Sequence, residues 1–215
     1  MSVSVDNNQA LINLFHHGTR LSYKKGEFII RPGEHPPGVF YIEEGIVKAY
    51  DITKYGEENL LIIRKVAEVF PLIWAITGQE RQVIYEALSP VTVWRIDRQA
   101  FLQQMHTDPY VLHSLLDMTV EMYRIHSERI INLEYRSVRE RLISFLLTMA
   151  GRFGSKKSDG SIVIHFPLRQ QDIASSINAS RETTSRELTA LEKKGYVTTN
   201  GGITIKNIKE LKSFL

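Results

Sequence analysis

Hydrophobic residues recur at helical spacing in two neighbouring segments near the end of the chain, within residues 168–195. The apolar positions are Ile173, Ala174 and Ile177 in the first segment and Leu188 and Leu191 in the second. A break in this pattern at Asn178 and Ala179 separates the two segments. Because residues three or four positions apart lie on one helix face, this pattern predicts two helices joined by a tight turn.

The second of these helices is expected to begin at Arg181. Ser180 stands where an N-cap residue belongs, since its hydroxyl can accept a hydrogen bond from the Thr183 amide. Four polar side chains then project within one arc, away from the leucines that face the core. They are Arg181, Glu182, Ser185 and Arg186.

This polar face has the chemistry needed in a DNA major groove. An arginine can donate two hydrogen bonds to guanine, a carboxylate can accept one from cytosine, and a serine can contact either a base edge or a phosphate. Glu182 could instead favour the positive end of the helix dipole and pair with Arg186 on a solvated face. The preceding helix and the hairpin described below favour DNA reading.

Residues 20–97 show a different pattern, with short apolar runs separated by turn residues. The runs rich in β-branched and aromatic residues are 28–30, 39–42, 46–50, 60–63 and 91–96. Glycine-containing pairs such as Lys25-Gly26, Pro32-Gly33, Glu44-Gly45 and Tyr55-Gly56 bound them. Short strands at regular spacing predict an antiparallel barrel or jelly roll, which is a fold that can enclose a ligand.

A long helix is predicted over about residues 108–136. Leu115, Met118, Met122 and Ile125 alternate at three- and four-residue spacing, which is typical of a coiled-coil seam and predicts a dimer interface. The alternative is a helix packed on its own barrel, with Tyr123, Ile130 and Ile131 flanking it. Two copies joined by such a seam would present two reading helices to a palindrome.

The chain is predicted to divide into domains of residues 1–136 and 137–215, because the long helix should break at Arg136 and Ser137. The second domain opens with an apolar helix from Val138 and a strand over 161–166. It closes with a hairpin around Asn200-Gly201-Gly202 and a short final helix. Strand, two helices and hairpin together predict a winged helix. The fold class is therefore α+β: a β jelly roll, a long dimerisation helix and a winged helix-turn-helix.

Composition and charge narrow the classes of function. Residues 1–136 hold 14 basic and 17 acidic side chains, whereas residues 137–215 hold 13 and 7, so the C-terminal part carries +6. A basic segment of this size favours a polyanionic partner. The chain has no apolar run of membrane-spanning length and no signal peptide, which predicts a cytoplasmic protein with no membrane partner.

Several chemistries are not expected from this chain. The absence of cysteine excludes disulfides and a cysteine-held iron–sulfur cluster. The seven histidines lack the spacing of metal ligands, so neither a metal site nor a cofactor is predicted. No His-x-His pair with a later Glu and His is present, so an enzyme of the cupin type is not expected. A signalling module whose winged helix contacts protein is the remaining alternative.

The segment Ser180-Arg181-Glu182-Thr183-Thr184-Ser185-Arg186 resembles the recognition helix of the CRP/FNR family, and the similarity extends over nearly the whole chain. The resemblance implies a homodimeric transcriptional regulator that binds double-stranded DNA, with RNA polymerase as a further expected partner. It implies a palindrome with TGA and TCA arms, and Arg181, Glu182, Ser185 and Arg186 as base-reading residues. It also places Gln171, Ser180 and Thr183 near phosphates.

The run GEHPPGVFYIEEGIVKAY resembles the cyclic-nucleotide-binding fold, and Arg81 matches the family's phosphate-binding arginine. Phe70 and Pro71, however, stand where the family has Gly-Glu, and Gln82 replaces a small hydroxyl residue. Cyclic AMP is therefore not the expected effector. Arg81 either pairs with Glu80 or Glu86 at the surface or binds another anion.

The other residues of this effector region leave two alternatives. Phe70, Leu72, Ile73, Trp74 and Ile76 favour an apolar or planar effector, or a filled pocket with control by abundance. The family's ligand contacts from the long helix map to His126 and Ser127. An effector would act by shifting the population towards the conformation that binds DNA.

Overall fold

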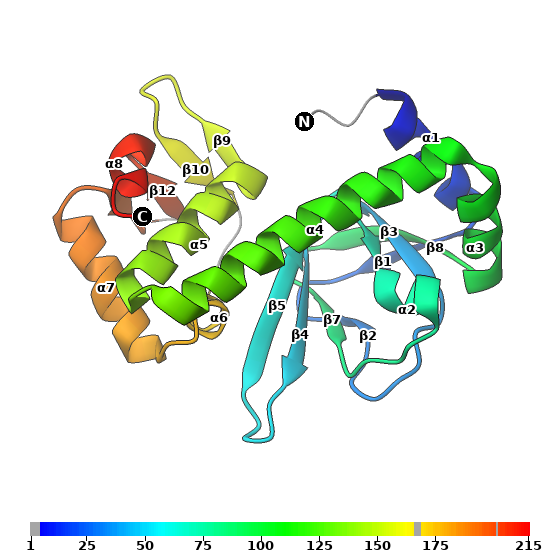
Figure 1. The fold of residues 1–215 in the computed structure, drawn as a ribbon, viewed down its shortest axis with the longest axis horizontal. Helices are drawn as coiled ribbons and strands as arrows, with labels where there is room; N and C mark the ends of the chain where they lie inside the picture. Colours follow the sequence, from blue (N-terminus) through cyan, green and yellow to red (C-terminus); the bar gives the residue numbers. More distant parts are fainter. Residues whose placement is uncertain (1–4, 166–168, 201) are drawn as a thin grey trace. The chain divides into compact units, whose positions relative to one another are not determined.

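The computed structural model describes residues 5–165, 169–200 and 202–215, and it divides into two compact units, Met1–Tyr123 and Arg124–Leu215 (Figure 1). The N-terminal unit begins with helix α1 and is built around eight strands. Its elements are α1 (Val5–His16), β1 (Thr19–Tyr23), β2 (Phe28–Ile30), β3 (Val39–Glu44), β4 (Val47–Ile52), β5 (Glu58–Arg64), β6 (Val69–Phe70), α2 (Leu72–Thr77), β7 (Ile84–Ala87), β8 (Val91–Ile96), α3 (Arg98–Thr107) and the first part of α4 (Pro109–Tyr135).

The eight strands form two antiparallel sheets, which together make a β-roll. One sheet has the order β1-β8-β3-β6 and the other has the order β2-β7-β4-β5. The turn between β3 and β4 requires glycine at Gly45, whose φ is +88° and whose position would bring a Cβ into the Pro90 carbonyl oxygen. The predicted fold class, with a jelly-roll-like N-terminal part, is confirmed.

An aromatic core joins the helices of this unit to one sheet. Phe15 of α1 stacks on Tyr41 of β3 with ring centroids 5.5 Å apart, and it also contacts Phe101 of α3. Leu115 of α4 belongs to the same buried cluster. Burial of such large side chains is the main source of stability for this side of the β-roll.

The other sheet holds a buried charge. Lys48 of β4 is 1% exposed, and its Nζ lies 2.9 Å from Glu58 and 3.1 Å from Glu86. The Tyr50 ring covers the ammonium group at 4.2 Å, and the Tyr50 hydroxyl donates to Glu86. The charge of Lys48 is therefore compensated by two carboxylates and an aromatic face, as a buried ammonium group requires.

The C-terminal unit contains the rest of α4, four further helices and one four-stranded sheet. Its elements are α5 (Val138–Phe153), β9 (Gly154–Lys156), β10 (Ile162–Ile164), α6 (Gln170–Ser176), α7 (Arg181–Lys193), β11 (Val197–Thr198), β12 (Ile203–Ile205) and α8 (Ile208–Lys212). The sheet order is β11-β12-β10-β9. The hairpin of β11 and β12 is the predicted wing, although Gly201 of its turn lies outside the described residues.

The break between α4 and α5 is sharp and well capped. Ser137 accepts a hydrogen bond from the Glu140 amide, and Glu140 accepts from the Ser137 amide at 2.8 Å, which completes a capping box. The buried Asn132 side chain donates to Ser144 Oγ at 2.8 Å and so ties the end of α4 to α5. The expected helix break at Arg136 and Ser137 is present, whereas the domain boundary at residue 136 stays a prediction.

The predicted seam on the long helix needs correction. Leu115 is part of the N-terminal core, Met118 packs against that core, and the Met118 sulfur accepts a hydrogen bond from the Val69 amide at 3.2 Å. Met122 is also buried and Ile125 is half-buried. Leu115 and Met118 therefore face the chain's own β-roll, which is the alternative that the three-and-four spacing could not exclude.

A different apolar stripe on the same helix faces solvent. Leu112, Leu116, Val120 and Tyr123 are 50%, 53%, 58% and 74% exposed. They are spaced four, four and three residues apart and so share one helix face. Among the described residues of the N-terminal unit, this stripe is a large apolar surface that no part of the unit covers.

Candidate nucleic-acid interface

The polar face of α7 lines a hollow of about 700 Å³ on the C-terminal unit. The residues around the hollow come from α6 and α7, and they include all four side chains predicted to read bases. They are Gln170, Arg181, Glu182, Ser185, Arg186, Thr189, Ala190 and Lys193. Arg181, Glu182 and Arg186 are exposed, so their charged ends are accessible to a ligand.

The start of α7 is fixed by its own side chains. Ser180 Oγ accepts the Thr183 amide hydrogen bond at 3.0 Å, as expected, and donates to Thr183 Oγ1 at 2.9 Å. Arg186 Nη2 donates to the same Thr183 hydroxyl at 3.3 Å. These bonds connect the cap to the guanidinium that points from the second turn, and the helix N-terminus adds a positive partial charge.

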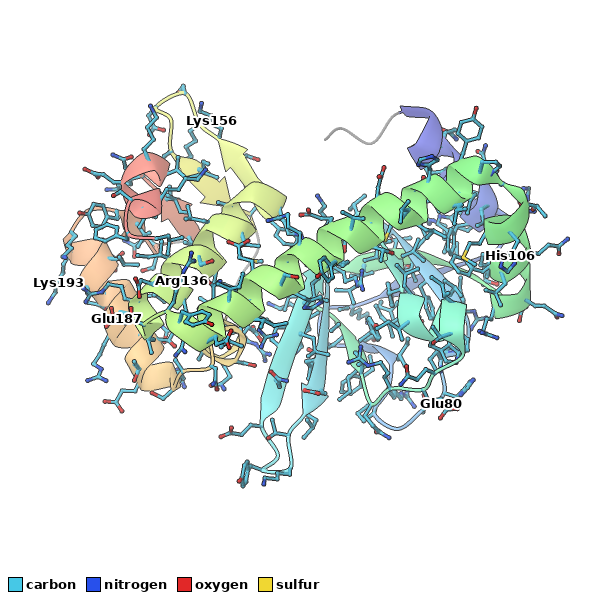
Figure 2. All side chains as sticks on the ribbon, viewed as in Figure 1. Glu80, His106, Arg136, Lys156, Glu187 and Lys193 are labelled. Carbon is cyan, nitrogen blue, oxygen red and sulfur yellow. The ribbon has the colours of Figure 1, made fainter. Side chains whose placement is uncertain are left out.

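The opposite face of α7 is anchored within the unit. Thr184, Leu188 and Leu191 are buried, and the Thr184 hydroxyl donates to the Ser180 carbonyl oxygen. Glu187 accepts from Arg139 Nε of α5 at 2.7 Å (Figure 2). This ion pair and the apolar contacts hold α7 against α5 while its polar face stays open.

The tight turn between α6 and α7 follows the predicted break. Asn178 has a φ of +48°, a left-handed conformation that asparagine tolerates better than most residues. Arg141 of α5 donates to the Asn178 carbonyl oxygen at 3.3 Å. The turn is thus held from α5, which fixes the direction in which α7 leaves it.

Sequence reasoning missed part of the rim of the hollow. Gln170, Thr189 and Lys193 line it, whereas the predicted phosphate residue Gln171 is exposed but lies outside the lining set. Thr189 and Lys193 follow Arg186 at three- and seven-residue spacing, so continuing the helical pattern would have found them. Lys193 adds a positive charge at the far end of α7 (Figure 2).

Comparison with known proteins identifies the two parts of the chain. The model of the cyclic nucleotide-binding domain matches residues 20–108, and the model of the Crp-like helix-turn-helix domain matches residues 140–214. This chain belongs to the CRP/FNR family. It is therefore a DNA-binding transcriptional regulator of the CRP/FNR type.

Individual CRP/FNR relatives agree over most of the chain. The global nitrogen regulator of Synechococcus elongatus is 28% identical over 77% of this chain and 75% of its own length. The CRP-like cAMP-activated global transcriptional regulator of Mycobacterium tuberculosis is 25% identical over 84% and 80%. The structure of FixK2 from Bradyrhizobium japonicum has a TM-score of 0.77 and 25% identity, covering 91% of this chain and 96% of that one. The first two of these relatives are regulators by name.

The predicted effector region of this CRP/FNR chain is filled by aromatic side chains. Phe70 is 0% exposed and stacks between Phe40 and Tyr85, with ring centroids 5.2 and 4.7 Å apart. Pro71 is buried beside it. Of the other residues that the sequence placed at a pocket mouth, Leu72 and Trp74 are buried, whereas Ile73 and Ile76 are exposed. Phe70 therefore occupies the inside of the β-roll rather than its rim.

The two polar positions of this region are exposed. Arg81 and Gln82 lie after α2 on the surface of the unit. The two carboxylates considered as surface partners for Arg81 have other partners, because Glu80 (labelled in Figure 2) lies 2.9 Å from His35 Nδ1 and Glu86 lies 3.1 Å from Lys48 Nζ. The role of Arg81, in a surface ion pair or in an anion site, stays a prediction.

The remaining predicted effector contacts lie in the other unit. His126 and Ser127 are half-buried on the part of α4 that belongs to the C-terminal unit. Their part in an effector site stays a prediction. In the part of the chain that the structure describes, no helix is both long and apolar enough to cross a membrane.

Proposed function

We propose that this chain is a homodimeric, sequence-specific transcriptional regulator that reads a palindrome with TGA and TCA arms. The observation that carries the proposal is the hollow on α7, where the four predicted base-reading residues lie together with Lys193. The hollow is lined by both positively and negatively charged side chains, as expected for a surface that discriminates between bases as well as binding phosphates. A purely electrostatic surface would not need Glu182.

Each residue has a role in this proposal. Arg186 binds guanine, Glu182 accepts from the cytosine amine, and Arg181 and Ser185 set the flanking preference. Ser180 and Thr183 carry hydroxyl oxygens at the positive end of α7, where short polar groups can contact phosphates. Gln171 is exposed on α6 and would provide a further phosphate contact.

The proposed dimer uses the exposed stripe of α4 formed by Leu112, Leu116, Val120 and Tyr123. An apolar stripe at four- and three-residue spacing matches the seam of two packed helices. Exposed apolar surface of this kind commonly marks an interface. Dimerisation would pair two reading helices, so the binding site should be a palindrome.

Gating by a small-molecule effector completes the proposal, and that effector is not cyclic AMP. Phe70, which stands where the family has glycine, takes up space inside the β-roll together with its two stacked neighbours, and Pro71 stands where the family has glutamate. An effector would act by its differential affinity for the two conformations of the dimer. RNA polymerase is the expected partner on the promoter.

Selection of binding sites from random DNA tests the proposal, with purified full-length protein at physiological salt. We expect a TGA/TCA palindrome. Arg186→Ala should then cost about 1–3 kcal/mol on the selected site and relax the preference at one position. Lys209→Ala removes an exposed positive charge from α8, outside the hollow, and serves as the matched control.

Two results would contradict this assignment. An equal loss of affinity for selected and random DNA in Arg186→Ala would mean that Arg186 contacts only phosphate. Selection of no sequence, together with indistinguishable DNA binding by Arg186→Ala and Lys209→Ala, would mean that the hollow reads no bases.

A further inference from the structure

A buried polar pair joins the last turns of α4 to α5 within the C-terminal unit. Asn132 is 8% exposed and Ser144 is 1% exposed, and Asn132 Nδ2 donates a hydrogen bond to Ser144 Oγ at 2.8 Å. Asn132 Oδ1 accepts from Nη1 of Arg136, which is labelled in Figure 2, at 2.6 Å. Ser144 Oγ in turn donates to Glu128 Oε1 at 3.4 Å. Both ends of the buried amide are therefore hydrogen-bonded, as burial of a polar group requires.

The chemistry of this pair differs from that of the helix surface around it. Ser144 lies on α5 in a run of buried residues that is otherwise apolar, namely Leu142, Ile143, Phe145 and Leu146. Apolar contacts are non-directional and would allow two helices to slide or turn with little change in free energy. Hydrogen bonds between buried groups are directional and costly to break, so the Asn132–Ser144 pair favours one placement of α5 on α4. A single buried asparagine fixes the register of coiled-coil helices in the same way.

A second set of polar contacts carries this placement from α5 to the reading helix. Arg139 Nε donates to Oε2 of Glu187 on α7 at 2.7 Å (Figure 2). Arg141 Nη2 donates to the carbonyl oxygen of Asn178, in the turn before α7, at 3.3 Å. Both arginines lie in the first turns of α5, shortly before Ser144. Hydrogen bonds therefore connect the end of α4 to α5, and α5 to α7, inside one compact unit.

The direction in which α7 is held matters for a protein that reads a palindrome. The stripe proposed as the dimer contact lies on α4, which is a single helix from Pro109 to Tyr135. In a dimer, the direction of each reading helix determines which spacing of half-sites can be bound by both subunits at once. One base pair added between the half-sites moves them about 3.4 Å apart and turns one by about 35° around the DNA axis. A fixed direction of α7 should therefore make the dimer selective for one spacing.

We propose that Asn132 is a positioning residue that sets the half-site spacing which the dimer accepts, by fixing α5 on α4 through Ser144. The inference rests on the proposed dimer and palindrome, and it adds a determinant of specificity that lies outside the hollow on α7. Asn132 acts through α5 and α7 rather than by contacting DNA. Its effect is on the distance between half-sites, whereas the residues of the hollow act on the bases within each half-site.

A spacing series on the selected palindrome tests this role. The full-length protein is titrated, with fluorescence anisotropy as the readout, into duplexes whose half-sites are kept and whose spacer is shortened or lengthened by one or two base pairs. The natural chain should lose about tenfold or more in affinity when the spacer changes by one base pair, because the DNA must deform to meet both reading helices. Asn132→Leu, which keeps a similar shape and makes no hydrogen bonds, should lose about threefold or less.

Base preference within one half-site separates positioning from base reading. In Asn132→Leu, the ratio of affinities for a TGA half-site and a substituted half-site should stay as in the natural chain, because the residues of the hollow are unchanged. Ser144→Ala removes the other member of the buried pair and should also flatten the spacing preference, and it decides the test if Asn132→Leu fails to fold. Thr148→Ala is the matched control on α5, since the Thr148 hydroxyl donates to the Ser144 carbonyl oxygen within the same helix. It should keep the natural spacing preference.

Three results would overturn the role of Asn132. A natural chain that binds all spacers equally well overturns it without any variant. A penalty for altered spacers that is as large in Asn132→Leu and Ser144→Ala as in the natural chain also overturns it. The third result is an equal loss of affinity at every spacer, which a loss of stability alone would give.

The same data distinguish this inference from the proposed function. A natural chain without preference for a TGA half-site at any spacer contradicts the proposed function, and the role of Asn132 fails with it. A kept base preference without any spacing preference contradicts the role of Asn132 alone.

Discussion

Replacing Phe70 by alanine removes the side chain that fills the inside of the β-roll. The ring is fully buried and stacks on both Phe40 and Tyr85. Truncating a buried phenylalanine costs about 3–5 kcal/mol, and loss of two aromatic pairs places this position in the upper half of that range. Phe28, which is 42% exposed, is the matched control, and Phe28→Ala should cost less than about 1 kcal/mol.

Tryptophan fluorescence can measure this loss in the N-terminal unit alone. The chain has two tryptophans, Trp74 and Trp94, and both lie in that unit. Urea unfolding followed at these residues therefore reports the β-roll even if the C-terminal unit unfolds separately. The free energy of unfolding should fall far more in Phe70→Ala than in Phe28→Ala. Equal losses would refute the view that the aromatic stack organises the β-roll.

Three further predictions concern α7, the stripe of α4 and the start of α5. Ser180→Ala should destabilise α7 by about 1 kcal/mol, whereas Ser180→Gly should destabilise it by only a few tenths of a kcal/mol, as measured by amide hydrogen exchange. Equal destabilisation by the two substitutions would mean that the Ser180 hydroxyl does not stabilise the start of α7. Leu116→Lys should convert the dimer to a monomer, as measured by sedimentation equilibrium. Asp117→Lys, whose side chain lies about 100° around the helix from Leu116, should leave the dimer intact. A dimeric Leu116→Lys protein would exclude the exposed stripe as the dimer interface. Hydrogen bonds from the Ser137 hydroxyl and amide lower the pKa of Glu140 below its ordinary value of 4.5. The ionised carboxylate therefore stabilises α5 fully above pH 4.5, and this stabilisation is lost as the pH falls through the lowered pKa of Glu140. Carbon-detected NMR titration should show a Glu140 pKa below 4.5 that rises in Ser137→Ala, and an unchanged value would contradict the capping box.

The sequence predicted the parts of the fold that follow from local rules. The cap at Ser180, the break at Ser137 and the helical stretch before it depend on a few adjacent residues, and all are present. Strands such as Phe28–Ile30 and Val91–Ile96 carry strong β-forming residues and were also predicted. The short strand Val69–Phe70 was not, because two residues give no period to detect.

Features that depend on distant parts of the chain were predicted less well. Spacing identified an apolar stripe on α4, but it could not show which stripe the β-roll would cover, and Leu115 turned out to be core. The same limit applies to Arg64, the last residue of β5, which is only 8% exposed although a lone arginine in a sequence carries no pattern that predicts burial. Its burial follows from strand pairing across β4, which local pattern does not determine.

The compensated charge of Lys48 has a consequence for how β4 finds its alignment. Side chains alternate between the two faces of a strand, so a slip of β4 by one residue would turn Lys48 towards the aromatic inside of the β-roll. Its ammonium group would then lose Glu58, Glu86 and the Tyr50 ring together. An apolar residue at position 48 could be buried in the misaligned sheet at little cost in free energy. A lysine raises the free energy of that misaligned sheet, because its charge would be buried without a partner. The lysine therefore disfavours a misaligned pairing of β4 with β5 and β7, in addition to its contacts in the native sheet.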